Sequence, residues 1–149
     1  MEKTKTEKIK IVAIVGPTGV GKTSLSIELA SFFDAEIISA DSRQVYRFMD
    51  IGTAKPTKKE REDIPHHLID VVSPDRDYSA ALFKRDAEAA LADIVSRGKR
   101  VFLTGGTGLY VRAFLEGLFT GPGRDDSVRG ALLKEAEAFG REYLHKELS

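Results

Sequence analysis

The chain has 149 residues, enough for one domain or for one domain and part of a second. Its 23 Lys and Arg balance its 23 Asp and Glu, and its 42% hydrophobic content is that of an ordinary globular protein. The absence of cysteine excludes disulfides, cysteine-bound metal centres and thiol nucleophiles. No apolar run approaches the roughly 20 residues of a membrane span, and we expect a soluble, cytoplasmic protein with no membrane partner.

Predicted strands alternate with predicted helices along the chain, which is typical of an α/β fold with a parallel sheet. The predicted strands are residues 9–15, 36–40, 67–72 and 101–104. The first is a nearly continuous β-branched run, as expected of a strand that is buried on both faces. Since crossover connections between parallel strands are right-handed, the helices should cover both faces of the sheet.

The predicted helices follow the 3.6-residue period of apolar side chains. The first, after residue 23, carries the apolar stripe Leu25, Leu29, Phe32 and Phe33. The second begins after Ser79 as N-cap, ends at Gly98, and has on one face Phe83, Ala87, Ala90, Leu91 and Ile94. Two more are expected at 109–118 and, as one amphipathic helix, at 128–148. We expect residues 1–120 to form a core with an incomplete sheet and residues 121–149 to begin a helical subdomain.

A phosphate-binding loop follows the first predicted strand. The segment matches G-x-x-x-x-G-K-[ST] in full, with Gly16, Pro17, Thr18, Gly19, Val20, Gly21, Lys22 and Thr23. In such a loop, backbone N–H groups and the start of the next helix surround phosphate oxygens, the lysine adds a positive charge, and the hydroxyl of Thr23 can bind Mg²⁺. The motif predicts a bound phosphate or diphosphate, and it suits ATP or another nucleotide equally well.

The sequence has no acidic residue at the strand end where a nucleotide-hydrolysing enzyme would carry one, but it has an Asp at the end of another strand. Such enzymes and kinases usually have a hydrophobic strand that ends in a magnesium-binding Asp. The predicted strand 101–104 ends instead in Thr104-Gly105-Gly106, whereas Asp41 follows strand 36–40. At the carboxyl edge of the sheet Asp41 should face the phosphates. It can accept a proton from a substrate, hold magnesium through water, or only cap the turn.

The segment from Asp41 to Arg61 has six basic and three acidic residues. It can form a patch that binds nucleic acid, or a solvated loop. Within it Tyr46, Phe48 and Met49 alternate with basic residues, and they can either stack on an unpaired base or pack in the core. A metal site at His66-His67 is not favoured, because neighbouring residues on a strand point to opposite faces.

The sequence resembles the tRNA dimethylallyltransferase family, also called tRNA isopentenyltransferases. The matching segments are GPTGVGKT (16–23), ISADSRQVYRFMDIGTAKP (38–56), PHHLIDVVSP (65–74), YSAALFKRDA (78–87) and GGTGLYVRA (105–113). The resemblance implies a P-loop fold, three layers with a parallel sheet, followed by the start of a helical tRNA-binding insertion. Phe48 stands where members commonly carry glycine, which predicts a differently shaped loop between Tyr46 and Asp50.

The resemblance also implies the reaction and its residues. Family members transfer a dimethylallyl group from dimethylallyl diphosphate, with Mg²⁺, to the exocyclic N6 amine of the adenosine 3′ to the anticodon. By this resemblance Asp41 is the general base, and Lys22 and Thr23 act on the diphosphate. The implied tRNA contacts are Asp41, Ser42, Arg43, Gln44, Thr107 and Arg129.

Members of the family are longer than this chain, and the resemblance therefore implies an amino-terminal portion of such an enzyme, expected as a monomer. Three other interpretations stay open at this point. They are a P-loop kinase of small molecules or nucleotides, an adenylate isopentenyltransferase, and an inactive portion that only binds diphosphate or RNA. Hydrolysis of ATP without any response to dimethylallyl diphosphate would favour the kinase.

Overall fold

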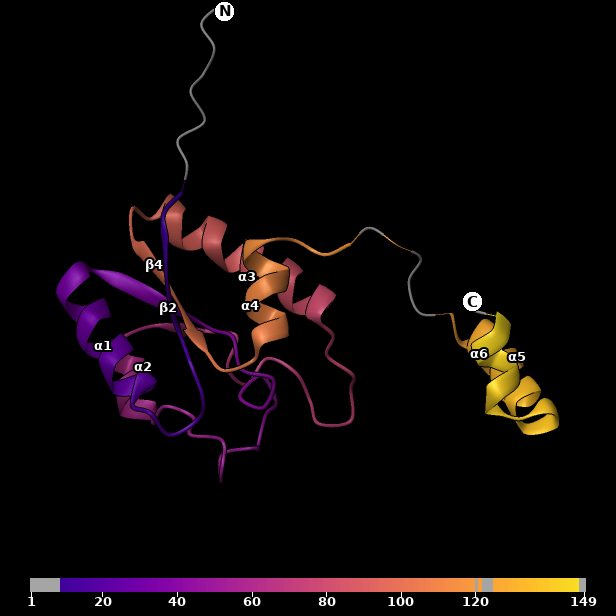
Figure 1. Cartoon of the computed structure of the whole chain (residues 1–149). Helices are drawn as coiled ribbons and strands as arrows, with labels where there is room; N and C mark the ends of the chain where they lie inside the picture. The colour runs from indigo at the N-terminus through magenta and orange to yellow at the C-terminus, as the bar shows by residue number, and fades with distance from the viewer. Residues whose placement is uncertain (1–8, 120, 122–124, 148–149) are drawn as a thin grey trace, which may run out of the picture. The chain divides into compact units, whose positions relative to one another are not determined.

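The computed structural model describes residues 9–119, 121 and 125–147. The chain divides into two compact units, Met1–Leu118 and Phe119–Ser149. In the first unit helices flank a sheet (Figure 1), and the second contains α5 (Asp126–Phe139) and α6 (Arg141–Glu147). No helix in this described part of the chain is long and apolar enough to cross a bilayer.

Four parallel strands form one sheet in the order β1-β4-β2-β3. They are β1 (Ile11–Val15), β2 (Ala35–Ser39), β3 (His66–His67) and β4 (Arg100–Gly105). This arrangement confirms the predicted α/β class and the parallel sheet. In the register, Thr104 of β4 lies between Ile14 of β1 and Ser39 of β2. The carboxyl ends of these three strands therefore meet at one edge.

The third strand is much shorter than the predicted 67–72, because the chain turns after His67. Leu68 and Asp70 have φ values of 64° and 59°, which an extended strand cannot contain. The segment instead bonds to the loop after β2, since the Asp70 N–H donates to Gln44 O (3.0 Å) and the Val71 N–H to Val45 O (2.9 Å). These bonds hold that loop in place.

The prediction that the first strand is buried on both faces is wrong. β1 is an edge strand that pairs with β4, and it has no second neighbour among the described strands. Val12 and Val15 are 47% and 54% exposed. A β-branched run indicates extended backbone, but it does not distinguish an edge strand from a central one.

Helices cover both faces of the sheet, as predicted. Helix α1 (Lys22–Phe33) lies on one face, and α3 (Ala80–Ser96) and α4 (Gly108–Leu115) lie together on the other (Figure 1). The buried face of α1 consists of Ser26 and Ala30. The predicted stripe is right for Leu29, which packs against the core on this face, and wrong for Phe32 and Leu25, which are 79% and 48% exposed. Two small side chains one turn apart let α1 approach the sheet closely, with Ile27 and Leu29 packed at the sides of this contact.

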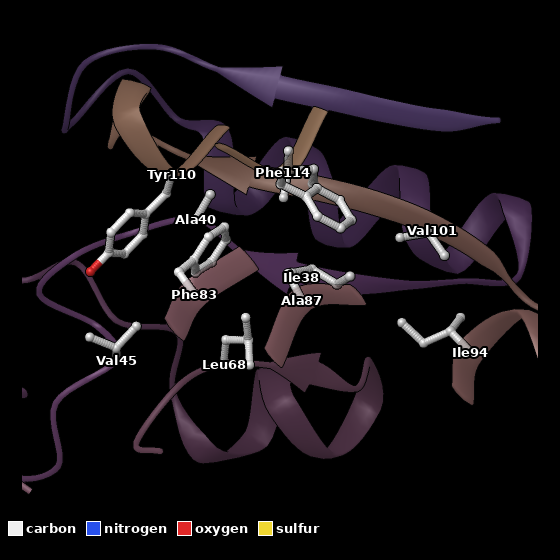
Figure 2. Packing of buried hydrophobic residues seen from close by; sticks show 11 residues of the cluster. Ile38, Ala40, Val45, Leu68, Phe83, Ala87, Ile94, Val101, Tyr110 and Phe114 are labelled. Carbon is white, nitrogen blue, oxygen red and sulfur yellow. The ribbon is translucent and has the colours of Figure 1, made fainter. Parts of the chain in front are cut away.

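The main hydrophobic core lies between the sheet and helices α3 and α4 (Figure 2). The rings of Phe83 and Tyr110 stack with centroids 4.4 Å apart and an interplanar angle of 11°. Ile38 of β2 and Leu103 of β4 are fully buried against them. This packing attaches both helices to the two central strands, whose ends carry the candidate site.

The predicted limits of α3 are confirmed in detail. The Ser79 hydroxyl accepts a hydrogen bond from the Leu82 N–H (3.2 Å), and Gly98 takes a φ of 73° just after the helix. The predicted apolar face is also confirmed, with Phe83, Ala87 and Ile94 buried and Ala90 and Leu91 partly buried.

Two predicted helices differ from the observed ones. Helix α4 ends at Leu115, not at 118, and Gly117 follows it with a φ of 90°. The helix expected at 128–148 is two helices, because Gly140 (φ 83°, ψ 161°) ends α5 and α6 starts after it. Residue 148, the last of the predicted helix, lies outside the described residues.

A buried carboxylate ties β2 to the end of α3. Glu36 is 4% exposed, and both of its carboxylate oxygens accept hydrogen bonds from the Arg97 guanidinium. The distance from Arg97 Nη2 to Glu36 Oε2 is 2.9 Å, and His67 Nε2 lies 2.7 Å from the same oxygen. The Arg97 hydrogen bonds lower the pKa of Glu36 from 4.5 to about 2, although burial acts in the opposite direction.

We expect this carboxylate to contribute to acid stability. A carboxyl group with a depressed pKa stabilises the fold above pH 4.5 and loses that contribution as the pH falls toward 2. Glu36→Gln should therefore unfold more easily than wild type at pH 7, and the difference should shrink below pH 4. Urea denaturation from pH 2.5 to 7 measures it, with the exposed Glu88→Gln as control. An equal deficit at every pH would contradict the assignment.

Candidate active site

The predicted phosphate-binding loop connects β1 to α1. Gly19 and Gly21 have φ values of 88° and 86°, a conformation that favours glycine. Gly21 is the N-cap of α1 and has no side chain to bond the first N–H groups of the helix, which leaves them available to an anion. The Lys22 ammonium donates to Pro17 O (2.6 Å), so the loop closes on itself.

A cavity of about 320 Å³ lies beside this loop. The loop contributes Thr18, Gly19, Gly21, Lys22 and Thr23 to its lining. Other segments contribute Asp41, Gln44, Thr104 and His66. The fold therefore brings Lys22 and Thr23 into one cavity with Asp41, although about 20 residues of sequence separate them.

A close backbone contact sets the position of Asp41. A Cβ atom on Gly105 would lie 2.1 Å from Ala40 O, so only glycine fits at the end of β4. Across this contact the Ala40 N–H donates to Thr104 O (2.7 Å), and the Thr107 N–H donates to Ala40 O (3.1 Å). The Gly105 carbonyl in turn accepts from the Gly16 N–H (3.4 Å). The phosphate loop and the turn after β2 are thus linked through one glycine.

Thr107 strengthens this link with its side chain. Its hydroxyl accepts a hydrogen bond from the Ser42 N–H (2.9 Å). Two predicted tRNA contacts, Ser42 and Thr107, are therefore neighbours in space although they are 65 residues apart.

One oxygen of Asp41 caps the turn that follows β2. Oδ1 accepts hydrogen bonds from the N–H groups of Arg43 (2.8 Å) and Gln44 (3.3 Å). Within the described residues Oδ2 has no hydrogen-bond partner. The capping interpretation thus accounts for one oxygen, and the second remains available to a ligand.

Gln44 has a role inside the fold that the sequence did not reveal. It is 8% exposed; its Oε1 accepts from the Ser39 hydroxyl (3.0 Å), and its Nε2 donates to Thr53 O and Ala54 O (both 3.1 Å). Its amide holds the loop of residues 41–54 against β2. Arg43, in contrast, is exposed, and Arg129 lies in α5 in the other unit.

Two buried polar atoms in the lining of the cavity have no partner among the described residues. They are Oγ1 of Thr104 and Nε2 of His66. His66 Nδ1 lies 2.7 Å from Ile64 O, and burial lowers the pKa of the imidazole. The neutral ring therefore donates from Nδ1 and directs a lone pair from Nε2. Sequence reasoning noted both residues but assigned neither to the cavity.

Part of the predicted basic segment is neutralised within the fold. The side chain of Lys55 is 3% exposed and pairs with Asp50 and Asp70, each at 2.7 Å. Burial opposes the charged form of Lys55, but these two carboxylates outweigh it and raise its pKa. Arg61, in helix α2 (Lys58–Asp63), also pairs with Asp70 (2.8 Å). Two of the six bases thus serve the loop itself.

The two aromatic residues of this segment have different environments, and only Tyr46 has the predicted core role. Tyr46 packs against the main core and bridges to Val72. Phe48 is 84% exposed and has a φ of 66°, the left-handed conformation that glycine favours.

The two histidines that were weighed as a metal site have different partners, since His66 bonds Ile64 O and His67 bonds Glu36.

Comparison with known proteins identifies the family. The sequence pattern of the IPP transferase family matches residues 44–149, which is more than half of the chain. The chain belongs to the IPP transferase family. It is 55% identical to tRNA dimethylallyltransferase 2 of Geotalea uraniireducens over 96% of its length, and 58% identical to the tRNA dimethylallyltransferase of Roseiflexus castenholzii over 94%. It covers 46% of each of these proteins.

Solved structures of similar proteins agree with this assignment. The tRNA isopentenylpyrophosphate transferase of Bacillus halodurans matches 95% of the chain with 48% identity and a TM-score of 0.74, over 47% of its own length. A eukaryotic dimethylallyltransferase acting on tRNA matches 80% with 39% identity and a TM-score of 0.67, over 29% of its own length. This IPP transferase chain therefore has the P-loop fold of its relatives and spans about half the length of the curated ones.

We expect the Gly105 contact to be essential to this IPP transferase fold. Gly105→Ala should destabilise the chain by about 3 kcal/mol or more, because the added methyl overlaps a backbone carbonyl that cannot move without breaking the sheet edge. Urea denaturation measures the loss. Gly108→Ala is the control, since a Cβ there meets nothing within 4 Å. Equal stability of the two variants would show that the contact with Ala40 O does not require glycine at position 105.

Proposed function

We propose that this chain is the diphosphate-binding portion of a tRNA dimethylallyltransferase. The enzyme would transfer the dimethylallyl group of dimethylallyl diphosphate to the N6 amine of the adenosine 3′ to the anticodon. The observation that carries the proposal is the single cavity in which the phosphate loop meets an available Asp41 oxygen. The names of the relatives, which match nearly the whole chain, support tRNA as the acceptor.

The strand next to β1 gives no support to a nucleotide kinase. β4 lies directly beside β1 and ends in Thr104-Gly105, where a kinase would be expected to present a magnesium-binding carboxylate. The acid of this cavity comes from β2 instead. A carboxylate beside a phosphate site, without that acid, suits proton removal from a nucleophile that attacks the carbon of a diphosphate ester.

The proposed reaction is a substitution at C1 of the dimethylallyl group. The N6 nitrogen forms a bond to C1 while the bond from C1 to the diphosphate oxygen breaks, and its electron pair leaves with the diphosphate. The free Oδ2 of Asp41 accepts the proton that N6 loses. The N–H groups at the start of α1 and the Lys22 ammonium stabilise the charge of the departing diphosphate.

The cavity also fits the magnesium ion that the family implies. Mg²⁺ usually keeps several water molecules and takes few protein ligands beside substrate phosphates. Thr23 would hold it, and the unpartnered Thr104 hydroxyl in the same cavity provides a site for a water of its shell. When bound, the ion neutralises diphosphate charge and makes it a better leaving group.

The acceptor adenine must leave its stack in the anticodon loop to reach this cavity, at a cost of a few kcal/mol. We propose that the unit Phe119–Ser149, with the exposed Arg129, begins a helical insertion that contacts the tRNA. Arg43, exposed beside Asp41, would contact it from the other unit. The absence of cysteine supports a reducing compartment such as the cytoplasm.

Mass spectrometry tests the function directly. The chain, alone and joined to the remaining half of the Bacillus halodurans relative, is incubated with unmodified tRNA, Mg²⁺ and dimethylallyl diphosphate. A mass gain of one prenyl group on the adenosine 3′ to the anticodon is expected. Modification of free AMP but not of tRNA would favour an adenylate isopentenyltransferase instead.

Lys22→Ala should weaken binding of pyrophosphate by about 10- to 100-fold, because a charged partner of the anion is lost. Isothermal titration with pyrophosphate and Mg²⁺ measures the affinity. Lys84→Ala removes the same charge from α3, away from the cavity, and should bind as wild type does. Unchanged affinity of Lys22→Ala would remove the loop as the diphosphate site.

Asp41→Asn should lower the rate of transfer by about 10²- to 10⁴-fold and leave pyrophosphate affinity nearly unchanged. Asn keeps an Oδ1 that accepts from Arg43 and Gln44, so the turn should survive, but it cannot take a proton. Single-turnover transfer and pyrophosphate titration on the same variant distinguish a general base from a magnesium ligand and from a residue that only caps the turn. A parallel loss of affinity would indicate a magnesium ligand, and near-normal transfer would leave only the cap.

A further inference from the structure

Phe48 is exposed and strained at the same time. Its ring is 84% exposed, and its φ of 66° is a conformation that bulky side chains rarely adopt. A ring in that position adds little to the hydrophobic core and costs conformational energy. Such a residue is explained when a partner uses the exposed ring.

Phe48 borders a hollow of about 570 Å³, which we call the Phe48 hollow. Its lining includes four basic and two acidic side chains. The carboxylates of Asp50 and Asp70 are taken by Lys55 and Arg61. The remaining bases are Lys58 and Arg47, whose Nε–H donates to Asp70 O (2.9 Å) and whose other guanidinium nitrogens stay available. Neither base forms an ion pair with a described residue.

The hollow therefore has an electropositive wall and an aromatic rim. The buried Nε–H of Arg61 has no acceptor among the described residues, which leaves one more donor for an anion. Basic groups attract a phosphate, and an exposed ring stacks on a base that is not paired. Together they fit an unpaired nucleotide, which presents a phosphate and a free base face within one residue.

The Phe48 hollow adjoins the candidate active site. Lys55 and Pro56 line both the hollow and the cavity of the phosphate loop. A nucleotide in the hollow would thus lie across one short segment of chain from the nucleotide whose base enters the cavity. This spacing suits neighbours along one RNA strand.

We propose that the Phe48 hollow binds an unpaired nucleotide of the tRNA anticodon loop next to the modified adenosine. Its base stacks on Phe48, and its phosphate lies against Arg47 and Lys58. This inference rests on the proposed function and adds a recognition site to it.

RNA binding tests the stacking contact. The affinity of the chain for an anticodon stem-loop RNA is measured by fluorescence anisotropy at a fixed salt concentration. Phe48→Gly should bind about 5- to 100-fold more weakly, whereas Phe48→Trp should bind about as tightly as wild type. Ile51→Ser is the matched control, because Ile51 is 99% exposed on the same loop but does not line the hollow.

Salt dependence tests the phosphate contact. Arg47→Gln should reduce the slope of log affinity against log salt by about one, since one phosphate contact is lost. Arg76→Gln removes an exposed charge outside the hollow and should keep the wild-type slope. The melting temperature should not fall in Phe48→Gly, because glycine accepts the left-handed backbone without strain.

The outcomes separate this inference from the proposed function. Wild-type affinity in Phe48→Gly overturns the stacking site, while prenyl transfer to tRNA by the same variant leaves the function intact. If the wild-type chain binds the stem-loop RNA no better than a DNA of equal length, and neither the chain nor its fusion to the remaining half of the Bacillus halodurans relative modifies tRNA, both fall. Self-association that Phe48→Gly abolishes, with RNA affinity unchanged, would assign the ring to contact with a second copy of the chain.

Discussion

The arrangement of the candidate site depends on one place where two backbones touch without a side chain between them. At the end of β4, Gly105 lets the carbonyl of Ala40 approach to a distance that any Cβ would block. The hydrogen bonds on either side of that contact bring the turn after β2 next to the phosphate loop. Neither Asp41 nor Lys22 is positioned by contact with the other. Both are positioned by the sheet edge on which this contact lies.

Sequence patterns predicted the features that depend on local chemistry. The phosphate loop, the Ser79 cap and the Gly98 stop each follow from the residues beside them, and the structure has them where expected. The same holds for the buried face of α3, since a long amphipathic helix carries its period in the sequence. The α/β class followed from the alternation of these elements.

The failures concern features that depend on distant neighbours. Apolar residues of α1 and β1 suggested burial, but burial depends on which surfaces pack against them, and no local pattern carries that information. The strand that begins near His67 was predicted too long, because leucine rarely adopts the left-handed backbone that Leu68 has, and a single Asp70 is a weak sign of a turn. The role of the Gln44 amide inside the fold also has no local pattern, because the carbonyl groups that it bonds, those of Thr53 and Ala54, lie 9 and 10 residues further along the chain.

The contact between Lys22 and Pro17 O gives the phosphate loop an internal competitor. In the closed loop the Lys22 ammonium already donates to Pro17 O. The free energy that an anion gains from Lys22 is therefore only the difference between its own hydrogen bond to the ammonium and the bond to Pro17 O that it displaces. A small singly charged ion gains little from that exchange. A ligand with several charged oxygens can occupy the helix N-terminus and the ammonium together, and it recovers the loss through the second contact. For the diphosphate site that we propose, this closed loop would favour anions with several charged oxygens over chloride and single phosphates.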